Sequence, residues 1–330
     1  MNYQRIKRYW LPVLRSGLLG KKPVRVMYDG LPVVLFRSGG EARALVDRCP
    51  HRGAALSAGR VREGTLECPY HGWRFDGQGQ CRHIPGRCSP PNKGQNAKSV
   101  EVSEFAEFVW LGPEDALTPY LSPFLTESHY DRFHWDLTLQ GDLLNVVENF
   151  LDATHTHHVH GGLIRSDGPR SEVRVEVRCV GESCQATYYG EEKASGLISR
   201  LFEGQRHTST GRFSLPAVAE IEYTSKERVE FGMAAYLAPS EPGAFRVQVT
   251  VATPKGMIPG SIKQLVLSPF LKKALQQDRD ILDLQRENLE CFPEHQHIST
   301  ELDVLRPHIA RLLKHGAFEE ERNRTVKMLI

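Results

Sequence analysis

The chain has 330 residues, which suits two domains better than one compact core of usual size. Apolar residues make up 40% and charged residues 25%, which excludes disordered, collagen-like and coiled-coil chains. The 42 basic and 40 acidic side chains nearly cancel, so no whole-molecule field would hold nucleic acid or an anionic membrane, although local basic patches remain open.

The N-terminal segment carries no evident export signal. Its apolar stretch at 10–14 is broken by Pro12 and ends at Arg15. A secretory signal needs roughly 7–15 apolar residues and a spanning helix about 20. We therefore expect a cytoplasmic protein without a membrane span. A reducing compartment argues against disulfides among the seven cysteines and leaves metal binding or catalysis open.

The first third of the chain predicts a small antiparallel β domain. Strand patterns separated by Gly-containing turns occupy residues 23–28, 33–37 and 44–47. Residues 49–86 are dense in Cys, His, Gly and Pro, which predicts loops held on a scaffold. After a surface loop at 86–98, residues 100–111 return to a strand pattern, and we expect a boundary near 112–119. The first domain is thus expected to span residues 1–115.

The remainder, residues 116–330, predicts an α+β domain with an antiparallel sheet flanked by helices. Residues 142–157 have a helical pattern that stops at Gly161-Gly162. Helices are also predicted at 261–290 and 300–313. No Gly-rich phosphate loop follows a strand, so no nucleotide-binding half is evident. The strands of the sheet are expected at 172–179, 185–189, 208–213, 219–224, 233–237 and 244–253.

Two mixed Cys–His pairs indicate a metal site in the first domain. Cys49-Pro50-His51 is followed, after sixteen residues, by Cys68-Pro69-Tyr70-His71. A tetrahedral zinc site is the alternative, but zinc fingers usually group both Cys in one knuckle and both His in the other. In a Rieske [2Fe–2S] cluster, two Cys bind one iron and two His bind the other. We predict that Cys49, His51, Cys68 and His71 hold such a cluster.

A second metal site is predicted in residues 149–160, which hold four histidines in six residues. Asn149, Asp152 and His155 recur every third residue, so we expect them on one stripe of the helix. His155 and His160 would diverge by about 140° on a continuous helix, so they bind one metal only if the helix ends between them. The other two histidines, His157 and His158, are interpreted as residues that contact a ligand or lie at the surface, and not as ligands themselves.

A carboxylate is needed to complete this site, because non-haem Fe(II) oxygenases use two His and one carboxylate and keep open positions. On a helical wheel of residues 271–290, Asp278 lies in the middle of an apolar stripe, whereas Asp280 and Asp283 fall on the polar side. Burying a lone carboxylate costs several kcal/mol unless it is paired or binds a metal. Asp278 is therefore the predicted third ligand, and a buried salt bridge is the alternative. The stripe around it comprises Leu271, Ala274, Leu275, Ile281, Leu282 and Leu289.

Both motifs resemble those of one family. Cys49-Pro50-His51-Arg52-Gly53 and Cys68-Pro69-Tyr70-His71-Gly72-Trp73 resemble the Rieske motif of ring-hydroxylating oxygenases. Asn149…Asp152…His155…His160 resembles the mononuclear iron motif of the same family, which adds an Asp in a late helix, in a context like that of Asp278. The resemblance covers most of the chain. It implies a Rieske domain at 1–115, a catalytic domain with mononuclear Fe(II) at 116–330, and catalytic roles for Asn149 and Asp152.

The resemblance also implies a function. Such proteins are terminal oxygenase components that take electrons from a separate reductase or ferredoxin and use O2 on a small organic substrate, here expected to be aromatic or polycyclic. The short catalytic domain is similar to that of the homotrimeric vanillate- and phthalate-oxygenase-type members. That favours hydroxylation or oxidative demethylation by monooxygenation over dihydroxylation. The strands between 172 and 253 are expected to line the substrate pocket.

The role of Asp152 is predicted separately. Placed one helical turn before His155, its carboxylate is expected to reach the second ring nitrogen and fix the ring orientation. The resemblance further implies that Asp152 links His155 to His51 or His71 of a neighbouring subunit in a head-to-tail trimer. Two rival classes stay open: a Rieske electron carrier or regulatory binding protein without oxygenase activity, and a zinc-dependent hydrolase. A metal count with a visible spectrum separates them.

Overall fold

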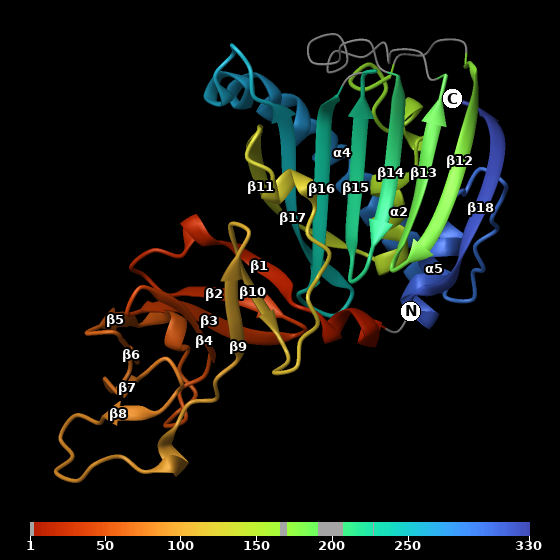
Figure 1. Cartoon of the computed structure of the whole chain (residues 1–330). Coiled ribbons are helices and arrows are strands. Elements are labelled where there is room, and N and C mark those ends of the chain that lie inside the picture. The colour runs from red at the N-terminus through yellow and green to blue at the C-terminus, as the bar shows by residue number, and fades with distance from the viewer. Residues whose placement is uncertain (1–2, 166–169, 191–206, 227) are drawn as a thin grey trace. The chain divides into compact units, whose positions relative to one another are not determined.

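The computed structural model describes residues 3–165, 170–190, 207–226 and 228–330 (Figure 1). By its contacts the chain divides into two compact units. The smaller unit comprises residues 7–119 together with 237–248, and the larger unit holds residues 120–236 and 249–330 together with the described N-terminal residues 3–6. Residues 237–248 thus group with the smaller unit although they follow the larger one in the sequence. No helix within the described ranges is long and apolar enough to cross a membrane.

The smaller unit consists of three small β-sheets, whose paired strands run antiparallel. The predicted meander is confirmed. The predicted strand at 100–111 is two strands, because Ala106 and Glu107 form a turn with positive φ. The first strand was not predicted because Pro12 suggests a break, yet it lies at a sheet edge, where proline is tolerated. The strands are β1 (Leu11–Arg15), β10 (Phe108–Gly112) and β9 (Glu101–Phe105); β2 (Val24–Tyr28), β3 (Leu31–Ser38) and β4 (Glu41–Val46); and β5 (Arg60–Arg62), β6 (Thr65–Glu67), β7 (Arg74–Phe75) and β8 (Cys81–His83).

The larger unit is built on an eight-stranded sheet in the order β11-β17-β16-β15-β14-β13-β12-β18. The six predicted strands are all present: β12 (Glu172–Gly181), β13 (Ser183–Tyr189), β14 (Thr208–Ser214), β15 (Val218–Thr224), β16 (Val229–Pro239) and β17 (Ala244–Pro254). The two edge strands, β11 (Tyr130–Gln140) and β18 (Phe318–Leu329), were missed. Residues 319–325 of β18 are all exposed and polar, so no alternation of apolar side chains marks them as a strand.

Helices lie behind the sheet in the view of Figure 1. The helix α2 (Leu143–Leu151) packs on β14 and β15, α5 (Arg306–His315) packs on α2 and β13, and α4 (Gly260–Cys291) packs on β11. The prediction of α4 is confirmed, whereas α5 begins at residue 306 and not at 300, with a proline in its first turn. A short α1 (Pro123–Thr126) precedes β11. Short 3-10 turns occupy Tyr3–Arg8, Ser16–Leu18, Leu56–Ala58, Lys93–Gln95 and His155–His157.

Candidate metal centres

Two loops of the smaller unit carry the Cys–His pairs and repeat the same backbone hydrogen bonds. Cys49 and Cys68 each donate their N–H to the carbonyl five residues further on, at 2.8 Å in both loops. Their own carbonyls accept from Gly53 at 2.9 Å and from Gly72 at 3.2 Å. Both glycines have positive φ, a conformation that glycine adopts without strain. The two loops are thus copies of one tight turn, and each presents one thiol and one imidazole.

The thiols lie inside the unit and the imidazoles lie towards its surface. Cys49 and Cys68 are buried in the core around Leu66 and Phe75, whereas His51 is half-buried and His71 is exposed. The centroids of the two imidazole rings are 4.5 Å apart. His51 Nδ1 is buried without a hydrogen-bond partner in the described part of the chain, and burial raises the pKa of the Cys49 thiol to about 11. A cation is therefore needed to hold a thiolate here, and two buried thiols with two outward imidazoles fit the ligand set of a Rieske cluster.

The helix before the second motif ends earlier than predicted. The last residue of α2 is Leu151, and Asp152 caps it in an extended conformation. The Asp152 carboxylate accepts hydrogen bonds from the Thr154 N–H at 2.7 Å, the Thr154 hydroxyl at 2.7 Å and the His155 N–H at 3.2 Å. These local bonds compete with the helical ladder. The predicted stripe shared by Asn149, Asp152 and His155 is therefore wrong, because only Asn149 belongs to the helix.

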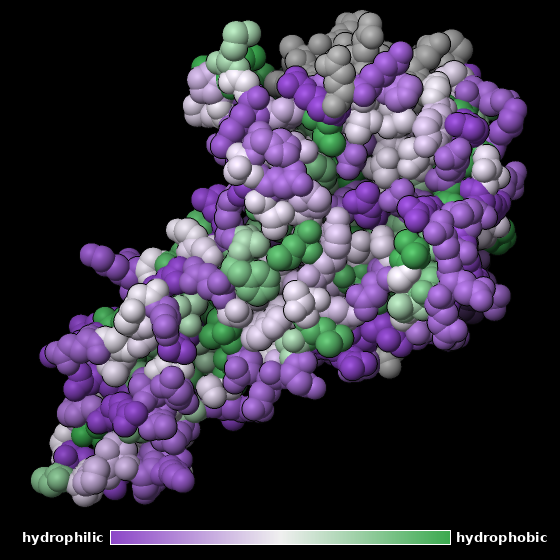
Figure 2. Space-filling view, viewed as in Figure 1, coloured by the Kyte–Doolittle hydropathy of each residue, from purple (hydrophilic) through white to green (hydrophobic). Residues whose placement is uncertain are grey.

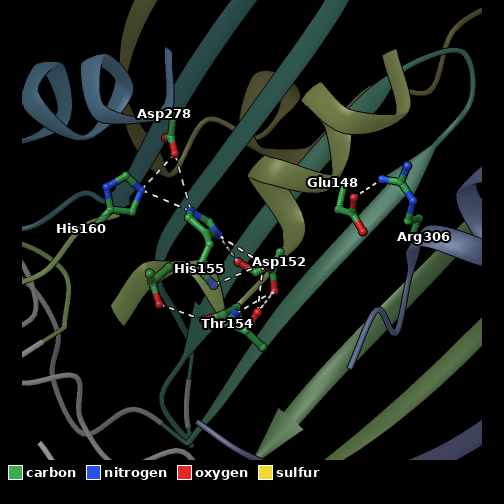
Figure 3. Close-up of polar contacts among 9 residues, drawn as sticks. Glu148, Asp152, Thr154, His155, His160, Asp278 and Arg306 are labelled. Carbon is green, nitrogen blue, oxygen red and sulfur yellow. Dashed lines mark hydrogen bonds and ion pairs between the residues drawn. The ribbon is translucent and has the colours of Figure 1, made fainter. Parts of the chain in front are cut away.

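The early end of α2 lets His155 and His160 converge, as one metal site requires. Their Nε2 atoms are 3.3 Å apart, and they lie 3.5 and 3.1 Å from Asp278 Oδ1 (Figure 3). Asp278 comes from α4 and is 8% exposed. One ligand atom from each of these three residues lies within 4.8 Å of the other two. In the described ranges, no other group of three or more His, Cys, Asp or Glu side chains is close enough to share a metal ion.

The second nitrogen of each imidazole reveals what this group needs. His155 Nδ1 lies 2.7 Å from the backbone carbonyl of Asp152, and His160 Nδ1 lies 3.1 Å from Gln277 Oε1. A carbonyl oxygen only accepts, so each Nδ1 keeps its proton and donates it. Both Nε2 atoms then face the Asp278 carboxylate, where each can hold a proton or bind a metal ion, so the group favours a cation among its three ligand atoms. The donor set of two imidazoles and one carboxylate fits Fe(II).

The role predicted for the Asp152 carboxylate needs correction. It lies 3.7 Å from His155 Nδ1, while the backbone carbonyl of the same residue makes the short contact. Burial lowers the pKa of His155, but Asp152 and Asp278 outweigh it and raise that pKa to about 9. Burial raises the pKa of Asp278, yet hydrogen bonds from His155 and His160 bring it below its usual value. The carboxylates thus favour positive charge at this point.

The other predicted residues of this region lie outside the group. His157 Nε2 is 3.4 Å from an Arg165 guanidinium nitrogen, and the exposed His158 is 3.0 Å from Arg170. On α4, Asp280 is exposed as predicted, but Asp283 is half-buried and Ile281 is exposed. The buried stripe is narrower than the wheel suggested because α4 is covered along one line only. That line comprises Leu267, Leu271, Ala274, Asp278 and Leu282.

An apolar pocket opens beside the three ligand atoms. The sheet strands between 172 and 253 supply one wall, as predicted, and α4 supplies another. Among the wall residues that the structure describes, Arg165 is the one basic side chain apart from the histidines. The apolar and aromatic wall residues include Trp135, Phe150, Tyr188, Ile221, Tyr223, Phe231, Met233, Val249, Val251, Leu271 and Leu275. Such a wall suits a small organic molecule and excludes water from the metal site.

A second, more open depression lies on the other side of His155. Its wall includes Asn149, Asp152 and His155, so Asn149 and Asp152 face both the depression and the pocket. The Asn149 side-chain oxygen is buried and lacks a hydrogen-bond partner within the described residues. Glu148, also on this wall, is paired with Arg306 (Figure 3). Neither this ion pair nor Gln277 was predicted, because each depends on contacts between distant parts of the chain that periodicity does not reveal.

Comparison with known families decides the class of this chain. A model described as the Rieske [2Fe-2S] domain matches residues 9–101. A model described as the vanillate O-demethylase oxygenase C-terminal domain matches residues 139–315, more than half of the chain. The chain belongs to the Rieske non-haem iron oxygenases. Its cofactors are a Rieske [2Fe–2S] cluster and a mononuclear iron, in agreement with the predictions.

Individual relatives of this Rieske oxygenase chain match part of it. Aminopyrrolnitrin oxygenase PrnD of Pseudomonas fluorescens is 32% identical over 168 residues, 47% of this chain and 46% of the relative. The oxygenase component of dicamba O-demethylase from Stenotrophomonas maltophilia is 32% identical over 174 residues, which are 49% of this chain and 50% of the relative. The chain thus spans about half the length of the curated relatives it matches. A crystal structure of dicamba monooxygenase bound to dicamba has a TM-score of 0.80 at 20% identity, covers 94% of this chain and 96% of that one, and shows the same fold.

Proposed function

We propose that this chain is a terminal oxygenase component that uses O2 and externally supplied electrons to hydroxylate or oxidatively demethylate a small aromatic or polycyclic substrate. One observation carries the proposal: two imidazole nitrogens and a buried carboxylate converge beside an apolar pocket, in a chain that also has a Rieske domain. An electron carrier has no need of this group, and a zinc hydrolase has no need of the cluster.

We assign the ligands as follows. Cys49, His51, Cys68 and His71 hold the cluster in a domain of residues 1–115, and residues 116–330 form the catalytic domain. His155, His160 and Asp278 hold the mononuclear iron. When bound, the cluster supplies electrons singly and the iron supplies the means to activate O2. The buried thiols, a His51 Nδ1 without a hydrogen-bond partner among the described residues, and the three ligand atoms that meet around Asp278 Oδ1 support this assignment.

The surrounding side chains shape the reaction. The Asp152 carbonyl and Gln277 keep each ligand imidazole in the tautomer that turns Nε2 towards the metal. The apolar walls from the sheet and α4 orient a substrate and keep water away. Asn149 faces both the pocket and the depression, and its side-chain oxygen has no hydrogen-bond partner among the described residues, which suits a group that accepts a hydrogen bond from a water beside the iron.

Monooxygenation is the reaction type that the relatives favour. Aminopyrrolnitrin oxygenase, dicamba O-demethylase and a methylxanthine N3-demethylase of Pseudomonas putida are among them. The oxygenase subunit of a 3-chlorobenzoate-3,4-dioxygenase from Comamonas testosteroni matches as well, at 35% identity over 173 residues. We therefore propose demethylation or hydroxylation ahead of dihydroxylation.

Electrons are proposed to come from a separate reductase or ferredoxin, as the description of the dicamba relative as an oxygenase component suggests. We further propose a homotrimer in which His51 or His71 of one subunit approaches Asp152 of the next. The surface position of both imidazoles and the open depression beside Asp152 support this arrangement. The proposed location is the cytoplasm, where the seven free cysteines would stay reduced.

Substrate-stimulated O2 consumption tests the proposal. The purified protein is supplied with a plant-type ferredoxin and its reductase and screened against methoxy- and N-methyl-substituted aromatic compounds. Wild type is expected to consume O2 and to release formaldehyde or a hydroxylated product with at least one compound. His155→Ala should lose this activity at least 100-fold, while His158→Ala, which changes an exposed histidine nearby, should stay within twofold. Equal activity in all three proteins would contradict the proposal.

A further inference from the structure

The beginning of α4 carries a cluster of exposed apolar side chains outside the pocket. We call it the α4 tip: Met257, Ile258, Ile262, Leu265 and Val266. Met257 is fully exposed and Leu265 is 76% exposed. Single exposed apolar residues are ordinary, but five within ten residues form a contiguous surface that marks an interaction site. Figure 2 shows apolar side chains at the upper left, where Figure 1 places the start of α4.

The charges around the α4 tip are almost all positive. Residues 255–277 contain four lysines and no acidic residue. Lys263 is paired with Asp131 of β11 at 2.7 Å, while Lys255, Lys272 and Lys273 are exposed. At 100° per residue, the last two continue the face that carries the tip. The nearby loop before β11 adds one exposed acid, Glu127, which lies 3.5 Å from His129.

We propose that the α4 tip docks on the surface of a membrane that contains anionic lipids. An exposed apolar helix face bordered by lysines is the pattern of helices that lie in such a surface. A second copy of the chain fits less well, because it would bring the same lysines together. Five side chains at a helix end also bury on the order of a few hundred Å², below the ~800 Å² per partner of a stable interface.

The docking proposal does not depend on the proposed function, but it adds to it. Leu271 and Ala274 lie two or three turns further along α4 and face the pocket. At 100° per residue these two residues lie on the side of α4 away from Ile262, so docking of the tip would place the pocket one helix diameter, ~10 Å, from the lipid phase in which apolar substrates concentrate. The substrate class that this favours is a membrane-partitioning molecule rather than a freely soluble one.

Co-sedimentation with vesicles tests the docking. The whole protein is mixed with vesicles of phosphatidylcholine alone or with one quarter phosphatidylglycerol, and wild type should bind the anionic vesicles. Leu265→Asp should weaken binding at least tenfold, while Ile298→Asp, which changes another highly exposed residue away from the tip, should have no effect. Lys272→Glu with Lys273→Glu should weaken binding by about fivefold for each lysine. No vesicle binding by wild type, or self-association that Leu265→Asp abolishes without vesicle binding, would overturn the proposal.

A different observation concerns the metal site. His160 is almost fully buried, and its Nδ1 hydrogen bond goes to the side chain of Gln277, the residue before the ligand Asp278. His155, by contrast, uses a backbone carbonyl, which no substitution of a side chain removes. Because α4 carries both Gln277 and Asp278, one helix would supply the ligand Asp278 and also orient the ligand His160.

We infer that Gln277 is a positioning residue that sets the tautomer and orientation of His160. This rests on the proposed ligand assignment. Without an acceptor at Oε1, His160 would be free to place its proton on Nε2, where it blocks the metal. Partners of this kind typically change metal affinity by 10–100-fold. The neighbouring Gln276 donates to Asp280 on the exposed side of the helix at 2.7 Å and provides a matched control.

The test is calorimetric titration of Fe(II), without O2, into protein that keeps its cluster but lacks the mononuclear iron. Gln277→Leu should bind Fe(II) 10–100-fold more weakly than wild type, and Gln276→Leu should bind within twofold. Gln277→Glu keeps an acceptor and should restore the affinity. Unchanged affinity in Gln277→Leu, or an equal loss in Gln277→Glu, overturns this inference alone. Unchanged affinity in His160→Ala would instead overturn the ligand assignment.

Discussion

Replacement of Asp152 by Asn separates a structural role of this carboxylate from a role in electron transfer. Its hydrogen bonds come from the Thr154 N–H, the Thr154 hydroxyl and the His155 N–H, at 2.7, 2.7 and 3.2 Å. Burial raises the pKa of Asp152, but the His155 side chain and the two Thr154 hydrogen bonds outweigh it and bring that pKa below its usual value, so the group is ionised at neutral pH. Hydrogen bonds to a charged acceptor contribute about 1.5–3 kcal/mol and neutral ones about 1 kcal/mol. Asn keeps the shape of the side chain and one acceptor oxygen, so we expect the free energy of unfolding of Asp152→Asn to be ~1–2 kcal/mol lower than that of wild type.

That loss is small enough to leave both metals bound, whereas the proposed link between subunits needs the charge. In Asp152→Asn the cluster should still be reduced, but its reoxidation by O2 in the presence of substrate should slow at least 100-fold. Stopped-flow absorbance of the cluster measures this rate, and thermal unfolding measures the stability. Thr154→Val removes the hydrogen bond from the Thr154 hydroxyl but keeps the charge of Asp152. It should therefore lower the stability as Asp152→Asn does, while the cluster is reoxidised at the wild-type rate. Reoxidation within tenfold of wild type in Asp152→Asn, or equal slowing in both variants, would refute the reasoning.

Three other outcomes follow from the site and the fold. Asp278→Ala should remove the mononuclear iron and leave the visible spectrum of the cluster intact, while Asp283→Ala should keep both metals; metal analysis of the two variants checks this. Imidazole ligation should place the midpoint potential of the cluster at roughly −150 to +300 mV in a redox titration, and a value near −400 mV would mean four thiolate ligands. A hydrogen bond from Arg37 lowers the pKa of Glu104 below the usual 4.5 of a glutamate, so the stabilisation by this pair is complete above that pH and is lost as the pH falls. Glu104→Gln should therefore be about 1 kcal/mol less stable at neutral pH and match wild type in strong acid, as chemical unfolding at several pH values would show.

The sequence was sufficient for the parts of the site that local chemistry determines. The Cys–His loops are short and self-contained, so spacing alone predicted the candidate cluster residues, which the two matching turns bring together. Asp278 was found because a carboxylate in an apolar stripe needs a partner, and the structure puts it 3.1 Å from His160. These assignments rest on features that a few residues carry by themselves. The ligand roles stay predictions until metal is measured.

Other features depend on competition or on distant contacts. The end of α2 is set by the Asp152 side chain, which offers the backbone an alternative to the helix that periodicity does not register. Strand β18 has no apolar alternation, because its exposed edge position places no demand on the side chains at 319–325. Gln277 and His160 are 117 residues apart, and only the packing of α4 brings them together. Local pattern therefore predicted which groups matter and not how the chain turns to assemble them.

Metal and sulfide analysis of the purified protein, joined to its visible spectrum, tests the central claim most directly. The account predicts two irons and two labile sulfides for the cluster and one further iron for each chain. His155→Ala should lose only the further iron and keep the spectrum, because its Nε2 belongs to the group around Asp278 and not to the Cys–His loops. Zinc in place of iron, with no labile sulfide and no visible absorption, would contradict the account.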